Sequence, residues 1–319
     1  VSLNQPIVMK TNISLILILC LLLGACKNGN ASSQNKSETP QDTIKAIKMP
    51  AIPQMMTAPE QRADFLAKHY WDNVNFADTN YIHHPEVTEQ AWADYCDLLN
   101  HVPLETAQQA MRNVIDRTNV DKKVFTYITD LADKYLYDPN SPMRNEEFYI
   151  PVLEAMIASP VLNETEKIRP QARLKLAQKN RIGTKALNFT YTLASGAQGS
   201  LYQLKAEYLL LFINNPGCQA CTETIEGLKN APIINQLLQE KKLVLLSIYP
   251  DEELDEWKKH LSEFPNEWIN GYDKKFTIKE EQVYDLKAIP TLYLLDKDKT
   301  VLLKDATAPA IEAYLMQHQ

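Results

Sequence analysis

The stretch YLLLFINNPGCQAC, residues 208–221, decides the fold of the C-terminal half of this chain of 319 residues. Residues 208–213 form a continuous apolar run of strand length, which is typical of the buried centre of an open sheet. Turn-forming residues follow at 214–217, and Cys218-Gln219-Ala220-Cys221 then opens a predicted helix. A strand that leads into a helix through two cysteines predicts an α/β domain with a chemically active thiol pair.

The predicted helix gives the two thiols different roles. Unpaired N–H groups and the positive end of the helix dipole stabilise a thiolate, so Cys218 is the predicted nucleophile. Cys221 lies one turn further into the helix and is the predicted resolving thiol, which attacks a mixed disulfide at Cys218. A structural disulfide stays open as an alternative, because an oxidising compartment permits one. A zinc site is disfavoured, since Cys96 with His101 or His260 supplies no second ligand pair at a recognisable spacing.

The residues around this stretch continue an α/β pattern. Apolar and polar residues alternate over 189–193 and 201–204 around a glycine-containing turn, which predicts a hairpin. The remaining expected strands are 243–248, 292–296 and 301–303, and the expected helices are 233–239, 252–261, 279–286 and 309–317. The pattern predicts an α/β domain over residues 183–319, with a central mixed sheet flanked by helices.

The region before it, residues 55–182, is predicted to be an α-helical domain. Apolar residues recur there at spacings of three and four, and glycine is absent from Pro59 until Gly183. The expected helices are 63–71, 87–99, 103–117, 122–135, 146–158 and 164–179. No internal repeat indicates a solenoid.

Candidate chemistry in the helical domain is sparse. His83-His84 has no second pair at ligand spacing, so metal binding is disfavoured. Cys96 lies within a predicted helix, where a half-buried, unreactive thiol is favoured. A further set of aromatic side chains could line a peptide groove, although their helical spacing favours core packing: Tyr70, Trp71, Phe76, Tyr135, Tyr137, Phe148 and Tyr149.

The N-terminus has the pattern of an export signal. Met9-Lys10 precedes the apolar run 13–23, which is shorter than the about 20 residues that span a bilayer. Leu23-Gly24-Ala25-Cys26 resembles the lipobox of bacterial lipoproteins, which implies cleavage after residue 25 and acylation of Cys26. An ordinary secretory signal is the alternative. The polar segment 26–54 is predicted to be a flexible tether.

The charge of the chain limits its partners. The formal net charge is −7, and removing residues 1–25 with Lys10 makes it about −8. This excess of negative charge argues against nucleic acid and against electrostatic binding to anionic lipids. Attachment to the membrane is therefore expected to come from the acyl chains on Cys26.

The C-terminal half resembles the TlpA/ResA-like thioredoxin family of membrane-anchored thiol:disulfide oxidoreductases. The resemblance covers residues 183–319 and rests on the strand before Cys218-x-x-Cys221 and on Ile289-Pro290-Thr291 entering a strand. It implies a cis Pro290 beside the cysteines, with the backbone of Ile289 pairing with bound peptide. The whole chain resembles Gram-negative lipoproteins that join a helical domain of unknown function to such a domain.

Three positions depart from the family. Gly217 replaces the usual tryptophan, Phe212 stands where thioredoxins carry a buried acidic residue, and Thr224 stands where many TlpA-like proteins have glutamate. Proton transfer at Cys221 therefore lacks its usual relay. Glu223 and Glu226 are the nearest substitutes, although solvated helix carboxylates are the favoured interpretation of both.

The sequence predicts a periplasmic, membrane-anchored thiol:disulfide oxidoreductase of a Gram-negative cell envelope. Its partners would be proteins with disulfides or thiols and a membrane electron donor, and it would need no cofactor or metal. A reductase is favoured over an oxidase or isomerase, although couples of this kind range from about −270 to −120 mV. One alternative is a non-catalytic scaffold lipoprotein with a structural thioredoxin-like domain, and another is a ligand carrier that uses the aromatic helical domain.

Overall fold

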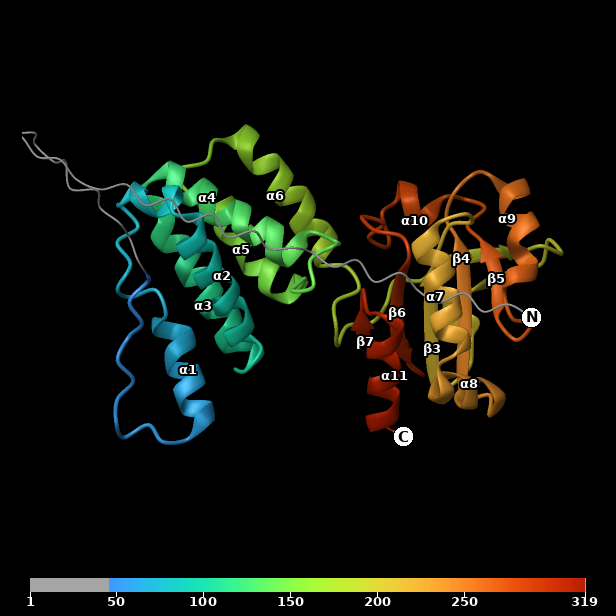
Figure 1. Cartoon of the computed structure of the whole chain (residues 1–319). Helices are drawn as coiled ribbons and strands as arrows, with labels where there is room; N and C mark the ends of the chain where they lie inside the picture. The colour runs from blue at the N-terminus through green and yellow to red at the C-terminus, as the bar shows by residue number, and fades with distance from the viewer. Residues whose placement is uncertain (1–45, 319) are drawn as a thin grey trace, which may run out of the picture. The chain divides into compact units, whose positions relative to one another are not determined.

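The computed structural model describes residues 46–318, in which a helical region precedes an α/β region (Figure 1). Both regions belong to one compact unit. The expected signal peptide, the expected lipidation at Cys26 and the tether before residue 46 lie outside the described residues. Within 46–318, no helix combines the length and the apolar character needed to cross a membrane.

The helical region contains six α-helices among the described residues, with short 3₁₀ and π turns between them. The α-helices are α1 (Pro59–His69), α2 (Pro85–Leu99), α3 (Leu104–Arg117), α4 (Lys122–Ala132), α5 (Glu146–Ala158) and α6 (Glu164–Ala177). The short turns are η1 (Thr79–His83), η2 (Thr118–Val120) and the π turn η3 (Asp133–Tyr137). The six expected helices correspond to α1 to α6.

Helical periodicity places the core of this region. The buried side chains of α3 recur at the spacing of one helix face: Ala107, Ala110, Met111, Val114 and Ile115. They pack with fully buried aromatic residues such as Trp92 and Phe125. Five of the seven singled-out aromatic residues are buried in this core, and Tyr135 and Tyr137 pack at its edge. Packing in the core accounts for these side chains, and Tyr135 and Tyr149 also each line a small surface pocket.

The α/β region is a seven-stranded mixed sheet with helices packed against it. Its strands are β1 (Thr190–Leu193), β2 (Gln198–Ser200), β3 (Tyr208–Ile213), β4 (Leu243–Tyr249), β5 (Ile269–Tyr272), β6 (Thr291–Asp296) and β7 (Val301–Lys304). Their order is β2-β1-β5-β4-β3-β6-β7. Strands β3, β4 and β5 are parallel, and the outer pairings are antiparallel. The predicted fold class is confirmed.

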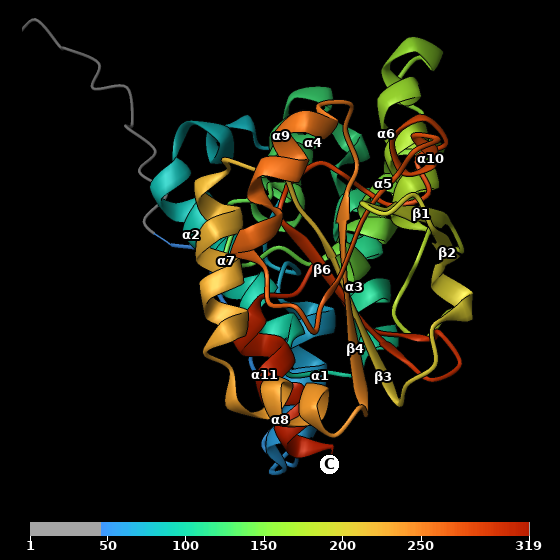
Figure 2. The ribbon, with the colours of Figure 1, turned by 90° about the vertical axis from the view of Figure 1, so that its right-hand side faces the viewer.

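The central strand β3 is buried on both faces, as its continuous apolar run predicts. Leu210 and Phe212 pack beneath the helices α7 (Gln219–Lys229), α8 (Pro232–Gln239) and α11 (Ala308–Gln317). These three helices lie together beside the strands (Figure 2). Leu209, Leu211 and Ile213 face the opposite side. The remaining elements are α9 (Leu254–His260), α10 (Thr277–Glu280), η4 (Leu201–Gln203) and η5 (Leu261–Glu263).

Three expectations in the α/β region need correction. Residues 201–203 form a 3₁₀ turn instead of a strand, because Ser200 and Gln203 cap it reciprocally. The expected helix over 279–286 is the short α10, which ends before Gln282 at a left-handed φ of 50°. Strand β5 is not among the expected strands.

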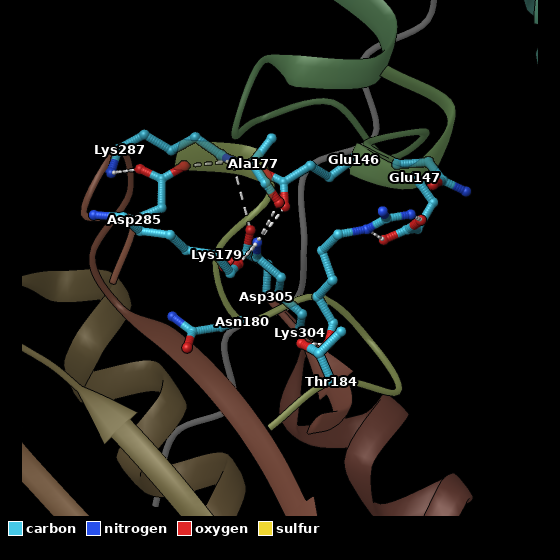
Figure 3. A network of polar contacts seen from close by, with 12 residues as sticks. Glu146, Glu147, Ala177, Lys179, Asn180, Thr184, Asp285, Lys287, Lys304 and Asp305 are labelled. Atoms are coloured by element: carbon cyan, nitrogen blue, oxygen red, sulfur yellow. Dashed lines mark hydrogen bonds and ion pairs between the residues drawn. The ribbon is translucent and has the colours of Figure 1, made fainter. Parts of the chain in front are cut away.

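A buried cluster of charges joins the two regions (Figure 3). Glu146, the first residue of α5, forms ion pairs with Lys304 of β7 and with Lys287, the latter at 3.4 Å. Lys287 also pairs with Asp285 at 2.8 Å and with Asp305 at 3.5 Å. All five side chains are at most 12% exposed. The cluster therefore fixes the start of α5 against the segment that carries Ile289 and Pro290.

Candidate active site

The loop between β3 and α7 is held by two asparagines. Asn214 is 2% exposed and donates to Ser247 Oγ at 2.8 Å. Asn215 donates to Asp251 Oδ2 at 3.0 Å, and Lys279 pairs with the other oxygen of that carboxylate at 2.9 Å. The loop is thereby tied to the segments after β4 and around α10.

The backbone conformation at position 217 explains why glycine is found there. Gly217 has φ of +70°, and a Cβ there would meet no other atom within 4 Å. A side chain at this position would therefore be strained by the backbone and would not be excluded by crowding. A tryptophan at this position, which the family resemblance predicts, would have to adopt a left-handed backbone conformation.

Cys218 caps the N-terminus of α7. Its Sγ accepts from the backbone N–H of Cys221 at 3.4 Å, and the side chain is half-buried. The same Sγ lies 3.8 Å from the carbonyl oxygen of Ile289. This position places the Cys218 sulfur at the N-terminal end of α7, where it satisfies one of the helix N–H groups that have no partner within the helix.

Cys221 has a different environment within the same helix. It is 2% exposed, and its Sγ accepts from the backbone N–H of Asn215 at 3.5 Å. Burial raises the pKa of Cys221 to about 12, although the Asn215 N–H favours the thiolate. The sulfurs of Cys218 and Cys221 are not joined by a disulfide.

The Ile289–Pro290 peptide bond is cis, as the resemblance implies. Ile289 and Pro290 line a cleft of about 760 Å³ that is also bounded by α7 and the start of α11. The helical region contributes the other boundary through Pro139, Asn140 and Arg144. The cleft therefore lies beside the half-buried thiol and has walls from both regions.

No carboxylate replaces the missing proton relay among the contacts of residues 46–318. Phe212 is fully buried beneath the helices. Glu223 and Glu226 are exposed, and they accept from Gln219 and Lys229, each at 2.9 Å. Neither glutamate contacts Cys221, so deprotonation of Cys221 would depend on solvent.

The resolving step should consequently depend steeply on pH. Only the thiolate of Cys221 attacks, and below a pKa of about 12 its population rises tenfold per pH unit. We expect the release of thionitrobenzoate from a mixed disulfide at Cys218 to accelerate about tenfold per unit from about pH 6 to about pH 9. Stopped-flow absorbance measures this rate.

The two exposed glutamates provide the control for this pH profile. Replacing Glu223 and Glu226 together with glutamine should slow the release by less than about tenfold. If the release rate of the wild-type protein instead levels off above about pH 7, and this plateau is lost in the double variant, then one of the two glutamates acts as the base that deprotonates Cys221.

Sequence reasoning singled out the thiols and the cis-proline segment, which the fold brings together. Their chemical roles remain predictions. Cys96 is 2% exposed, and burial raises its pKa. His84 contacts Glu86 at 3.1 Å, and no cluster of three or more His, Cys, Asp or Glu side chains in residues 46–318 could hold a metal ion.

Asn214, Asn215 and Arg144 were not singled out by sequence reasoning. The turn-forming composition of 214–217 was the available signal for the two asparagines. No pattern in the sequence pointed to Arg144, because only the tertiary fold brings this residue to the cleft.

Comparison with known proteins assigns both regions. Residues 206–301 match the family described as thioredoxin-like. Residues 25–180 match a domain of unknown function (DUF5106). The crystal structure of a thioredoxin-like protein from Bacteroides caccae is 84% identical, with a TM-score of 0.85, and the match covers 87% of this chain and 100% of that chain. The chain belongs to the thioredoxin-like family and carries an N-terminal DUF5106 domain.

Other solved structures match the C-terminal part. The C-terminal domain of an uncharacterized Bacteroides fragilis protein is 69% identical, with a TM-score of 0.43, and the match covers 43% of this chain and 98% of that one. The thioredoxin domain of a Bacteroides vulgatus thiol-disulfide oxidoreductase is 19% identical, with a TM-score of 0.39, and the coverages are 43% and 97%. No curated protein matches the chain.

Proposed function

We propose that this protein is a thiol:disulfide oxidoreductase that reduces disulfide bonds in protein substrates. The observation that carries the proposal is the contrast between the two cysteines. Cys218 caps a helix, is half-buried and lies 3.8 Å from the Ile289 carbonyl at the cleft, whereas Cys221 is buried and its pKa is raised to about 12 by burial. Such a pair separates an attacking thiol from a resolving one.

The proposed reaction passes two electrons to the substrate. The Cys218 thiolate attacks one sulfur of the substrate disulfide, whose S–S bond breaks and releases the other sulfur as a thiolate. Cys221 then loses its proton and attacks Cys218 Sγ, which releases the second substrate thiolate and leaves a Cys218–Cys221 disulfide. A dithiol of a membrane-bound donor protein would reduce that disulfide and complete the cycle. Trapping of mixed disulfides in Cys221→Ala tests the proposal.

The proposed location is the periplasmic face of a Gram-negative cell envelope, with a lipid anchor on Cys26. Support for it comes from the sequence alone, through the apolar run 13–23 and the Leu23-Gly24-Ala25-Cys26 tetrapeptide. A lipid anchor would keep the thiol site close to a membrane donor.

Acylation should disappear when Cys26 is replaced. We expect metabolic labelling with a radioactive fatty acid to mark the wild-type protein and not Cys26→Ala, because the acyl chains need the Cys26 sulfur and its free amine. Gel autoradiography of the purified proteins measures this. Equal labelling of the two proteins would contradict the anchor.

A scaffold function is the second candidate. It is favoured by the absence, among the described contacts, of a carboxylate that could take the proton of Cys221. In that case the oxidised pair would be a structural disulfide that resists dithiothreitol. Ready reduction by dithiothreitol at neutral pH would argue against the scaffold.

A further inference from the structure

The cleft beside the cis-proline segment has one wall that the thioredoxin-like region does not supply. Pro139, Asn140 and Arg144 come from the segment between the π turn η3 and α5. We infer that this segment selects substrates, with Arg144 receiving an acidic side chain of an extended protein segment that carries the disulfide. The inference rests on the proposed function and names the substrate class.

Arg144 is the cationic residue of the cleft whose charge is available to a ligand. Its Nη2 donates to the backbone carbonyl of Asp305 at 2.7 Å, and it forms no ion pair with any carboxylate in residues 46–318. Lys287, the other cation that lines the cleft, already pairs with three carboxylates. The guanidinium of Arg144 therefore keeps its full charge for a partner, and its planar donors suit a carboxylate.

Helix α7 contributes a negative charge to the same cleft. Glu223 on α7 lines the cleft and accepts a hydrogen bond from the neutral side chain of Gln219. An acidic side chain would be repelled at the α7 wall and attracted at the wall formed by the helical region. The cleft thus orients a substrate as well as binding it.

The wall that carries Arg144 is built as a rigid element. Ser141 Oγ donates to the Tyr135 carbonyl at 2.6 Å, and Asn145 N–H donates to the Leu136 carbonyl at 3.0 Å. Two residues after Arg144, Glu146 enters the buried charge cluster with Lys287 and Lys304 (Figure 3). Because the segment is fixed before binding, little ordering would be needed to present the guanidinium.

The size of the cleft agrees with a short peptide segment. Its volume of about 760 Å³ lies within the range of sites that enclose one small ligand, and it is too small for a folded domain. Small and apolar residues such as Ala220, Gly227 and Pro290 also line the cleft. An extended chain could therefore reach Cys218 while a neighbouring side chain meets Arg144.

Two disulfide-bearing peptides that differ only by glutamate or lysine next to the cysteine test the inference. Wild-type protein should reduce the glutamate peptide with a kcat/KM about fivefold above that of the lysine peptide. Arg144→Glu should reverse the preference by a similar factor, and Arg144→Lys should keep it. Reduction of neutral hydroxyethyl disulfide, which offers no charge for position 144 to select, gives the rate to which the peptide kcat/KM values of each protein are normalised.

The matched control is Arg62→Glu, because Arg62 is exposed on α1, does not line the cleft and gives the same change of net charge. An unchanged preference in Arg144→Glu, or an equal reversal in Arg62→Glu, overturns the inference. Equilibrium binding of the same peptides with serine in place of cysteine separates the two proposals. If the peptides bind with a charge preference that depends on Arg144 but are not reduced, the oxidoreductase proposal is refuted and substrate selection by Arg144 is supported. If the peptides are reduced without a charge preference, the oxidoreductase proposal stands and selection by Arg144 is refuted.

Discussion

Cys221→Ala should accumulate mixed disulfides with envelope proteins in growing cells, whereas Cys218→Ala should accumulate almost none. Cys218 is half-buried and lies 3.8 Å from the carbonyl oxygen of Ile289, a residue that lines the cleft, so substrate attack should occur at Cys218. Without Cys221 no second thiol remains in α7 to resolve the covalent complex. We expect Cys218→Ala to lower the rate of disulfide reduction by about a thousandfold or more. Non-reducing gels and mass spectrometry identify the trapped partners.

Cys96→Ser is the matched control for this trap. Cys96 is 2% exposed and burial raises its pKa, so its removal should change neither trapping nor turnover. Alkylation of wild-type protein in intact cells should recover the Cys218 and Cys221 thiols reduced, since a reductase is kept reduced by its donor. If neither cysteine variant traps a partner and the wild-type pair stays oxidised, the scaffold becomes the better explanation.

The features predicted well from sequence are those determined by local residues. The apolar run of β3, the following turn and Cys218 at the start of α7 are adjacent in the chain, and each has its own local signal: a continuous apolar run, turn-forming residues and a Cys-x-x-Cys pair. The buried face of α3 is also determined by residues that are close together in the sequence. This is why the fold class and the thiol pair could be found without coordinates.

Strand β5 was missed because a tertiary contact determines its sequence. Asn270 and Gly271 disfavour a strand, yet the ring of Tyr191 packs so closely that a Cβ at position 271 would lie 2.9 Å from it. Gly199 on β2 meets the same ring, with 2.6 Å for its hypothetical Cβ. The glycines that weaken the sequence pattern are therefore what lets the antiparallel hairpin pack beside β5.

The cleft wall was missed for a related reason. Arg144 belongs to a turn of the helical region, and nothing near it in sequence indicates a thiol site. Its position depends on pairing between residues far apart in the chain, as in the contact of Glu146 with Lys287 and Lys304. Such pairing has no periodic signal in the sequence.

Lys287→Met should lower the free energy of unfolding by about 3–5 kcal/mol. Burial alone would lower the pKa of Lys287, but the carboxylates of Asp305, Glu146 and Asp285 outweigh it and raise that pKa. Lys287 therefore stays charged in the fold and balances three acids together with Lys304. Its removal would leave three buried carboxylates facing one cation, and urea denaturation followed by circular dichroism measures the loss.

Lys122→Met provides the comparison, because Lys122 is 51% exposed and pairs with Glu166 at 2.6 Å on the surface. We expect that change to cost less than about 1 kcal/mol. Adding Asp285→Asn to Lys287→Met should recover part of the loss, since one of the uncompensated charges is then removed. Equal effects of Lys287→Met and Lys122→Met would mean that the cluster is solvated, and that it does not hold α5 against the cis-proline segment.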